Sequence, residues 1–340
     1  MLSVSVVIPT YNRAHLLPRA IQSALQNCRS GDEILVVDDA STDNTAEVVQ
    51  QYGPPVHYLP VPHGGAGAAR NHGIEQARGD LVAFLDSDDE WLPDKLELMR
   101  TTMQQLPHVL FCFSEFRVQD TSGGVFPRYL RQWHRDTRPW DEILGRGIWY
   151  SSLAPLPAGR EDFRIHVGDL YLQEMRSHYV ATTTLVVRRR EAGSALFFDT
   201  RLPICEDKAC FGRLARQGLA AYLDTETSIQ WGHDGPRLTD LHGRAEIWLS
   251  AYLQLLEEIW GSDTEFLARH GRQWQQTRQQ LLLRRARWYL RQGKTRAAWR
   301  DLCCVEQATW QEKALARLPQ EIVEPLLAAF RWCRRRLVWS

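Results

Sequence analysis

The sequence lacks long apolar runs: nowhere do about 18 hydrophobic residues follow one another, so we expect no transmembrane helix. The N-terminus also lacks the charged region and the small-residue cleavage site of a signal peptide, and it has the pattern of a strand instead. The 7 cysteines are an odd number without metal-ligand spacing, since Cys303 and Cys304 are adjacent. These absences predict a cytoplasmic protein whose thiols are reduced.

Net charge is absent as well, because 41 basic residues balance 41 acidic ones. The balance is uneven: from Thr264 onward there are 16 basic and 6 acidic residues, and the residues before Thr264 include 25 basic and 35 acidic ones. An acidic body suits a metal-using site, and a basic end suits an anionic partner such as a membrane surface. Nucleic acid is not expected as that partner, because no nucleic-acid-binding module accompanies the arginines.

Strand and helix patterns alternate through the first third of the chain. Continuous apolar runs at residues 3–9 and 33–38 are typical of strands buried on both faces of a parallel sheet. Further strands are predicted at residues 56–61 and 81–85, with helical patterns between them. This alternation predicts right-handed βαβ units in an open α/β sheet, which binds ligands at the carboxyl ends of its strands.

The remaining chain is less regular and then becomes helical. A strand pattern returns around residues 180–188, and a helix is predicted at about residues 206–217. After residue 233 the pattern is helical to the end, with a helix–turn–helix pair broken at Gly293. We therefore expect an α/β domain over residues 1–240 and an all-helical region over residues 241–340.

The run Asp86–Asp89 holds three carboxylates in four positions, directly after an apolar strand. Such carboxylates repel one another unless a cation lies among them. Oxygen ligands suit Mg²⁺ or Mn²⁺, and these ions usually hold substrate phosphates as well. In the alternative interpretation, Asp88 or Asp89 only caps the helix that is expected to start near Pro93.

Four ordered motifs carry a resemblance to a known family. They are Ser-Val-Val-Ile-Pro-Thr-Tyr-Asn-Arg ending at Arg13, Val-Val-Asp-Asp-Ala-Ser-Thr-Asp ending at Asp43, Gly-Ala-Ala-Arg-Asn-His-Gly ending at Gly73, and the segment that ends at Asp89. In this order and spacing they closely resemble the family-2 glycosyltransferases. These are inverting enzymes that use nucleotide sugars and have the glycosyltransferase A-type fold.

The resemblance extends over roughly residues 3–240 and fades beyond. It implies a Rossmann-like mixed sheet flanked by helices, followed by the helical C-terminal region. It also implies a nucleotide-sugar-binding half at residues 1–115 and an acceptor half at residues 116–240.

On the donor side, the resemblance places Pro9, Thr10 and Tyr11 beside the nucleobase, where Tyr11 could cover the base or could simply be a packed ring. It places Asp39 where it can accept hydrogen bonds from the base or the ribose, whereas Asp38 could support the loop. These residues follow the first two predicted strands.

The resemblance also places residues around the diphosphate. Arg70 is expected to reach the nucleotide or its diphosphate. The glycines before it are no dinucleotide fingerprint, because Arg70 replaces the third glycine and the turn follows the third strand rather than the first.

Asp86 is expected to face the ribose and Asp88 to ligate Mn²⁺ or Mg²⁺, with Asp89 in a supporting role. His233 is expected to complete the metal shell or to bind the phosphate. Trp231 and Gln230 depart from the family's usual residues before this histidine, which leaves its register open.

Displacement at an anomeric carbon needs a base that deprotonates the acceptor hydroxyl. By resemblance, Asp207 is that base, and Glu206 contacts the acceptor or a supporting group. Glu206 could be the base itself, and both could instead complement the dipole of the helix that they begin.

Two further segments admit more than one interpretation. The aromatic residues Trp133, Trp140, Trp149 and Tyr150 could stack on acceptor sugars or form a structural cluster. The basic segment at residues 330–339 could lie on an anionic leaflet at the inner face of the cell membrane, pack on the protein or bind a partner.

We therefore expect an enzyme that moves a sugar from a nucleotide-diphosphate donor to the hydroxyl of a glycan or lipid-linked acceptor, in cell-surface polysaccharide or glycolipid synthesis. The main alternative is a catalytically silent nucleotide-sugar-binding or scaffold protein, which the intact Asp86, Asp88 and Asp207 disfavour. A nucleotidyltransferase would be expected to carry a glycine-rich basic loop after the first strand. A dinucleotide oxidoreductase is the weakest of the alternatives.

Overall fold

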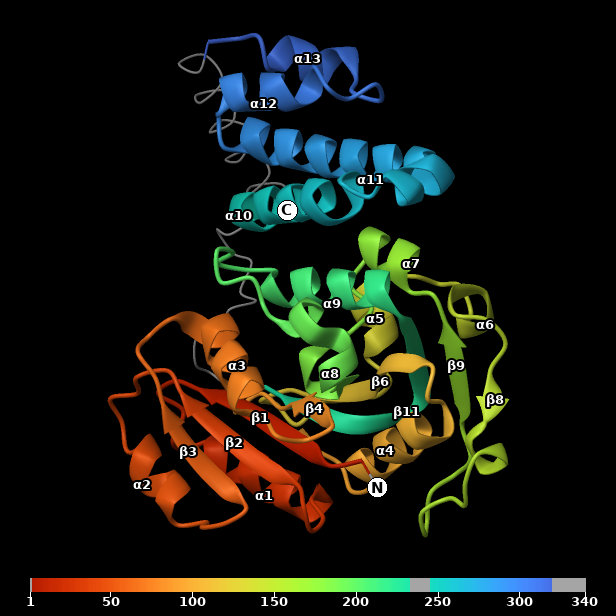
Figure 1. Ribbon diagram of the computed structural model, residues 1–340. Helices are drawn as coiled ribbons and strands as arrows, with labels where there is room; N and C mark the ends of the chain where they lie inside the picture. Colours follow the sequence, from red (N-terminus) through yellow and green to blue (C-terminus); the bar gives the residue numbers. More distant parts are fainter. Residues whose placement is uncertain (1, 233–244, 320–340) are drawn as a thin grey trace. The chain divides into compact units, whose positions relative to one another are not determined.

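The computed structural model describes residues 2–232 and 245–319 (Figure 1). The chain forms two compact units: an α/β unit of Met1–Arg201 and Glu206–Gly235, and a helical unit of Leu202–Cys205 and Pro236–Ser340. The expected boundary at residue 240 falls outside the described residues, and the assignment of donor and acceptor halves stays a prediction.

The strands of the described residues form one mixed sheet of 11 strands. Its main path runs through β3 (Val56–Pro60), β2 (Glu33–Asp38), β1 (Val4–Thr10), β4 (Leu81–Phe84), β10 (Val186–Arg188), β6 (Val109–Gln119), β11 (Leu219–Trp231), β9 (Arg164–Gly168) and β8 (Ile148–Trp149). Two short strands lie off this path, β5 (Asp89–Trp91) on β11 and β7 (Val125–Phe126) on β6. The first four strands are parallel, and β10 is antiparallel to both of its neighbours. The predicted mixed α/β sheet is confirmed.

Helices flank the sheet of the α/β unit on both faces (Figure 1). They are α1 (Leu17–Asn27), α2 (Thr45–Gln50), α3 (Gly65–Gln76), α4 (Lys95–Gln105), α5 (Leu130–His134), α6 (Trp140–Ile143), α7 (Tyr171–Arg176), α8 (Arg189–Ala192) and α9 (Glu206–Gln217), with 3₁₀ turns at Tyr150–Ser152, Thr182–Thr184 and Gly193–Leu196. Every residue of β1 is buried, and its side chains alternate between the faces. Val6 and Ile8 share a core with α1 and α4, whereas Val7 lies against α3.

The strand expected at residues 180–188 is shorter than predicted. Only Val186–Arg188 pairs in the sheet, and Thr182–Thr184 forms a 3₁₀ turn. The Thr184 hydroxyl donates to the carbonyl of Ala181 at 2.8 Å. Such local bonds from threonine to the backbone compete with strand pairing.

The aromatic segment is in large part structural. Trp140 is buried and stacks on Tyr222, with ring centroids 3.7 Å apart. Tyr150 is buried against Phe163. Sugar stacking is therefore wrong for Trp140 and Tyr150. It stays a prediction for half-exposed Trp149 and for Trp133, whose ring also packs edge-on against Phe116.

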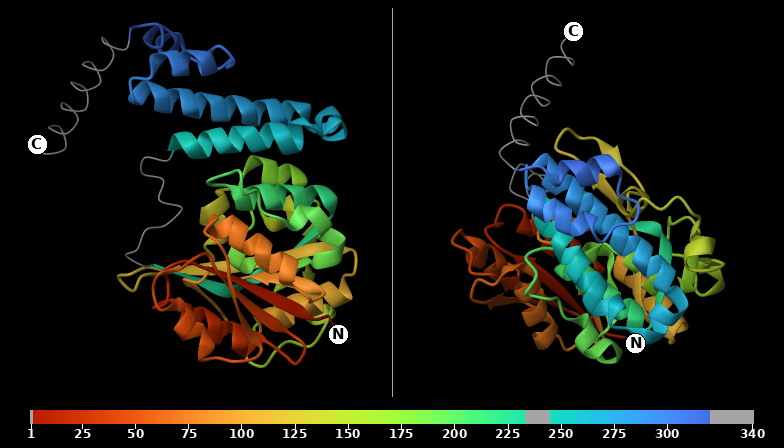
Figure 2. Two further views of the ribbon diagram at one scale, coloured as in Figure 1. Left: turned by 60° about the vertical axis from the view of Figure 1, so that its left-hand side comes forward. Right: turned by 90° about the horizontal axis from the view of Figure 1, so that it is seen from above.

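The helical unit contains α10 (Ala245–Leu255), a π-helical turn (Leu256–Gly261), α11 (Thr264–Arg291), α12 (Thr295–Leu302) and α13 (Trp310–Leu315). Helices α10, α11 and α12 pack in that order (Figure 2). Gly293 has a φ of 74° in the turn between α11 and α12, which confirms the predicted break. No described helix is both long and apolar enough to span a bilayer.

Gly73 allows α3 to approach the sheet, so we predict that Gly73→Ala destabilises the protein. The added methyl group would lie 2.4 Å from Val7 Cγ1 and 3.3 Å from Val37 Cγ2. Such overpacking should lower the free energy of unfolding by about 1–3 kcal/mol, measured by urea unfolding. The control is Gly271→Ala in α11, where the methyl group meets no atom within 4 Å. Equal effects of the two changes would contradict this account.

Candidate active site

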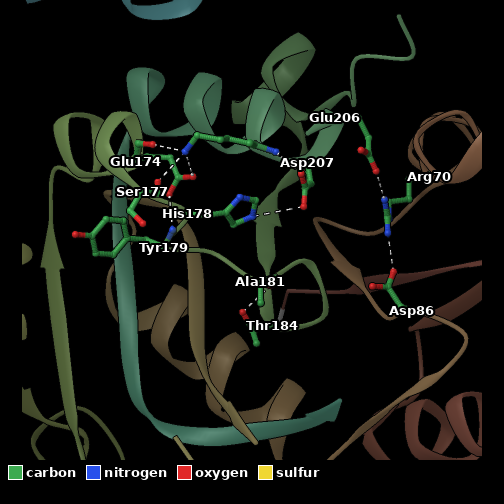
Figure 3. A network of polar contacts seen from close by, with 11 residues as sticks. Arg70, Asp86, Glu174, Ser177, His178, Tyr179, Ala181, Thr184, Glu206 and Asp207 are labelled. Atoms are coloured by element: carbon green, nitrogen blue, oxygen red, sulfur yellow. Dashed lines mark hydrogen bonds and ion pairs between the residues drawn. The ribbon is translucent and has the colours of Figure 1, made fainter. Parts of the chain in front are cut away.

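Arg70 of α3 joins two carboxylates from distant parts of the chain. Its Nη2 lies 2.7 Å from Asp86 Oδ1 and its Nη1 lies 3.2 Å from Glu206 Oε1 (Figure 3). The guanidinium is buried and also lies 5.0 Å from the centre of the Phe198 ring. Burial alone would lower the pKa of Arg70, but Asp86 and Glu206 outweigh it and raise the pKa. The contact with a diphosphate, expected from the sequence, stays a prediction.

Asp207 follows Glu206 at the start of α9 and faces a histidine. Its Oδ2 lies 3.4 Å from His178 Nε2 (Figure 3). Desolvation raises the pKa of Asp207, but His178, Arg70 and the Lys208 amide together lower it to about 2. Burial and the neighbouring Asp207 raise the pKa of Glu206. The environment separates the pKa values of the two carboxyls and keeps Asp207 ionised, as a general base requires.

The segment that carries His178 is held in place by Lys208 of α9. Buried Lys208 donates to the carbonyl oxygens of Glu174 and Ser177 and pairs with the Glu174 carboxylate at 3.4 Å. Glu174 in turn accepts a hydrogen bond from the Tyr179 amide at 3.0 Å. Both neighbours of His178 in the chain are therefore held, which orients its ring toward Asp207.

His178 was missed from the sequence. It lies just before the segment assigned to a strand at residues 180–188, and no motif marks it. Its role depends on the packing of α7 against α9.

The acidic run after β4 is balanced by arginines from α1 and the loop before it. Arg13 Nη1 lies 2.7 Å from Asp88 Oδ2, and Arg19 donates to the Asp88 carbonyl at 2.8 Å. Asp89 is buried in β5, where burial, Asp88 and Asp86 raise its pKa.

The capping interpretation of this run is wrong. Helix α4 begins at Lys95, and its N-cap position is Asp94, so neither Asp88 nor Asp89 caps it. Instead, Asp89 pairs with Gln230 of β11 in the sheet.

The residues around Asp88 fit a divalent cation. The side chains of Asp86 and Asp88 are 29% and 25% exposed, and carboxylate oxygens are the ligands that Mg²⁺ and Mn²⁺ prefer. No cluster of three or more metal-ligating side chains occurs in residues 2–232 and 245–319. One or two carboxylates together with substrate phosphates are a usual site for Mg²⁺. His233 lies outside the described residues, so its predicted metal role is untested.

An aromatic pair marks the carboxyl ends of β1 and β3. Tyr11 is 45% exposed, and its ring centroid lies 4.7 Å from that of His63. The hydroxyl of Thr10 is buried without a hydrogen-bond partner. No sequence pattern marks His63 as a site residue. Its contact with Tyr11 joins two loops that are far apart in the chain, so it appears only in the folded structure.

The two aspartates after β2 support loops. Asp39 accepts from the amides of Gly64 and Gly65 at 2.7 and 2.9 Å. Asp38 accepts from the Ser41 amide at 2.9 Å and from the Tyr58 hydroxyl at 2.6 Å. Pro9 is buried in β1 opposite Val37. Nucleotide contacts of Pro9, Thr10, Tyr11 and Asp39 remain predictions.

The first part of the chain is similar to known glycosyltransferases. Residues 5–152 match the family model described as "Glycosyl transferase family 2". The chain is 34% identical over 131 residues to the putative teichuronic acid biosynthesis glycosyltransferase TuaG of Bacillus subtilis, covering 37% of this chain and 52% of TuaG. It is 32% identical over 165 residues to the uncharacterized glycosyltransferase YibD of Escherichia coli, covering 43% of this chain and 48% of YibD. The matches thus span about half the length of these relatives.

Two solved structures share the fold. Residues 1–349 of Staphylococcus aureus TarS, in complex with UDP-GlcNAc, superpose with a TM-score of 0.59 at 17% identity, covering 93% of this chain and 84% of that one. The mannosyltransferase PcManGT of Pyrobaculum calidifontis, with GDP-Man and Mn²⁺, gives 0.52 at 16% identity, covering 99% and 82%. The predicted glycosyltransferase A-type fold is confirmed.

We predict that His178→Ala destabilises the protein most at about pH 5 and least near pH 2. The pKa of Asp207 is depressed in the folded state, so its interaction with His178 stabilises the fold above the unfolded pKa and is lost as the pH falls toward 2. The difference in unfolding free energy at pH 5 should be about 1–2 kcal/mol. Exposed His108→Ala serves as the control. If His178→Ala lowers the free energy of unfolding equally at every pH, the effect comes from lost packing rather than from charge.

Proposed function

We propose that this chain transfers a sugar from a nucleotide-diphosphate donor to an acceptor hydroxyl, with inversion at the anomeric carbon, because residues 5–152 match the glycosyl transferase family 2 model. The observation that carries the proposal is a continuous set of polar contacts. It runs from Asp86 through Arg70 to Glu206, whose neighbour Asp207 lies beside His178. It joins the strand end expected to hold the donor to the carboxylate expected to activate the acceptor.

Asp207 acts as the general base in this proposal. It takes the proton of the acceptor hydroxyl while the acceptor oxygen bonds to the anomeric carbon and the bond to the diphosphate oxygen breaks. The leaving nucleoside diphosphate takes the electron pair, and Asp207 later releases its proton to solvent. His178 keeps Asp207 ionised and oriented before the acceptor arrives, which is a form of preorganisation.

Besides its predicted contact with the diphosphate, Arg70 positions two carboxylates. Its two ion pairs orient Asp86 toward the donor and Glu206 beside the base. Half-exposed Tyr11 and the buried, unpartnered hydroxyl of Thr10 support a nucleotide contact at the neighbouring strand end.

Asp88, with Asp86 beside it, would hold Mn²⁺ or Mg²⁺. The bound ion would neutralise charge on the donor's diphosphate. The accessible carboxylate oxygens support this role, as does the Mn²⁺ found with GDP-Man in PcManGT. Arg13 already balances Asp88, so the ion would share this carboxylate with a guanidinium.

The acceptor is proposed to be a growing cell-surface glycan or a lipid-linked sugar. TuaG, named for teichuronic acid biosynthesis, and TarS, solved with UDP-GlcNAc, support an acceptor and a donor of these kinds. The cytoplasmic location and the membrane contact of residues 330–339 are part of the proposal, and that segment lies outside the described residues.

Asp207→Asn should abolish transfer and leave donor binding intact. Loss of the general base should lower turnover by about 10²–10⁴-fold, because the amide cannot accept the proton. The Kd of the nucleotide should change less than about threefold, since Asp207 does not face the donor strand ends in this scheme. Turnover would be followed by release of nucleoside diphosphate, and nucleotide binding by calorimetry.

Two variants complete this test. Glu191→Gln removes an exposed carboxylate from α8 and should leave turnover unchanged. Glu206→Gln separates the two candidate bases. Full activity of Asp207→Asn, with a dead Glu206→Gln, would assign the base to Glu206 and contradict the role proposed for Asp207.

Metal dependence can be measured through nucleotide binding, without following sugar transfer. In a thermal-shift panel of nucleoside diphosphates, Mn²⁺ should raise the melting temperature further when a nucleotide is present, and EDTA should remove the added shift. Asp88→Asn should lose this synergy. The same nucleotide shift in Mn²⁺ and in EDTA would contradict the metal site.

A further inference from the structure

The helical unit contains a cavity that the proposed transfer does not use. Its volume is about 630 Å³, and it is lined by Arg296, Trp299, Arg300, Ala316 and Arg317. Arg296 and Arg300 lie one turn apart on α12, and Arg317 follows the end of α13. Three arginines from two segments of the chain therefore line one cavity.

These three arginines have no carboxylate partner within the described part of the chain. Residues 264–319 include only four acidic residues, and three of them are held by arginines that do not line this cavity. The pairs are Arg269 with Glu265 at 3.0 Å, Arg285 with Asp301 at 2.8 Å and Arg287 with Glu312 at 2.6 Å. The three arginines that line the cavity are therefore among the basic residues of this unit that pair with no described carboxylate.

Like charges four residues apart on a helix repel each other. Arg296 and Arg300 have this spacing, and Arg317 adds a third positive charge. An anion in the cavity would relieve the repulsion. Guanidinium groups bind phosphate and carboxylate oxygens in two-point contacts, so either group would suit them.

The floor of the cavity is apolar. Trp299 packs against the small core of the helical unit, and Ala316 is a buried member of that core. The Arg317 guanidinium lies 4.4 Å from the centre of the Trp299 ring. A matching ligand presents C–H surface as well as negative charge, as a sugar or polyol with anionic groups does.

We propose that this arginine cavity binds a glycan or polyol chain that carries phosphate or carboxylate groups, and that it serves as a second contact for an anionic acceptor. Recognition of the anion follows from the cavity alone. The choice of a glycan as the bearer of the charge rests on the proposed function.

The test is calorimetric titration of the full chain with two anionic probes and a neutral one. Oligogalacturonate supplies carboxylates, tripolyphosphate supplies phosphates, and maltotetraose is the neutral saccharide. We expect binding of at least one anionic probe, no binding of maltotetraose, and weaker binding at higher salt. Which anion binds more tightly will distinguish a phosphate-bearing chain from a carboxylate-bearing one.

The variant Arg296→Gln with Arg300→Gln should raise the Kd of the bound anion at least about tenfold, because it removes two charge-assisted contacts. The matched control is Arg291→Gln, an exposed arginine of the same unit that does not line the cavity, and it should change Kd less than twofold. Thermal melts of all variants check that they are folded.

Three outcomes would overturn the proposal: equal weakening by Arg291→Gln, equal binding of maltotetraose, or binding to anionic lipid vesicles without binding of either soluble anion. Nucleoside diphosphate binding, measured on the same samples, separates this proposal from the proposed function. If the double variant loses anion binding and no sample binds a nucleotide, the cavity is an anion site and the transferase role is refuted. If nucleotide binding is intact and neither anion binds, the anion site is refuted and the transferase role stands.

Discussion

The buried guanidinium of Arg70, held between Asp86 and Glu206, is the interaction on which the rest of the candidate site depends. It links the end of β4 to the start of α9, two elements far apart in the sequence. Removing one partner of such a buried group leaves an uncompensated charge, which is costly in a poorly solvated interior. The acidic loop and the amino end of α9 are therefore stable in this arrangement only together.

The carboxylates of the site face basic side chains. Arg13 balances Asp88 and His178 faces Asp207, each from a different part of the chain. Lys208 adds a further cation that holds the turn behind His178. The carboxylates are thus oriented before any ligand binds, so little reorganisation is needed when charge develops during transfer.

The helical unit shows the opposite arrangement. Several of its described carboxylates are paired with arginines, whereas Arg296, Arg300 and Arg317 line one cavity and pair with no described carboxylate. In the candidate site of the α/β unit, carboxylates pair with basic side chains. In the proposed anion site, the arginines keep positive charge available to an external anion.

The sequence by itself determined the strands and helices of the parallel sheet, the positions of Asp86, Asp88 and Asp207 at the ends of elements, and the break at Gly293. These features depend on local apolar patterns and turn residues, which a chain carries along its length. Only the tertiary structure placed His178 beside Asp207, His63 beside Tyr11 and Arg70 between two carboxylates. It also buried Trp140 and Tyr150 and shortened the strand before Arg188. The physical reason is that these contacts join residues from different strands and helices, so they arise from the order of the sheet and the packing upon it, which no local pattern records.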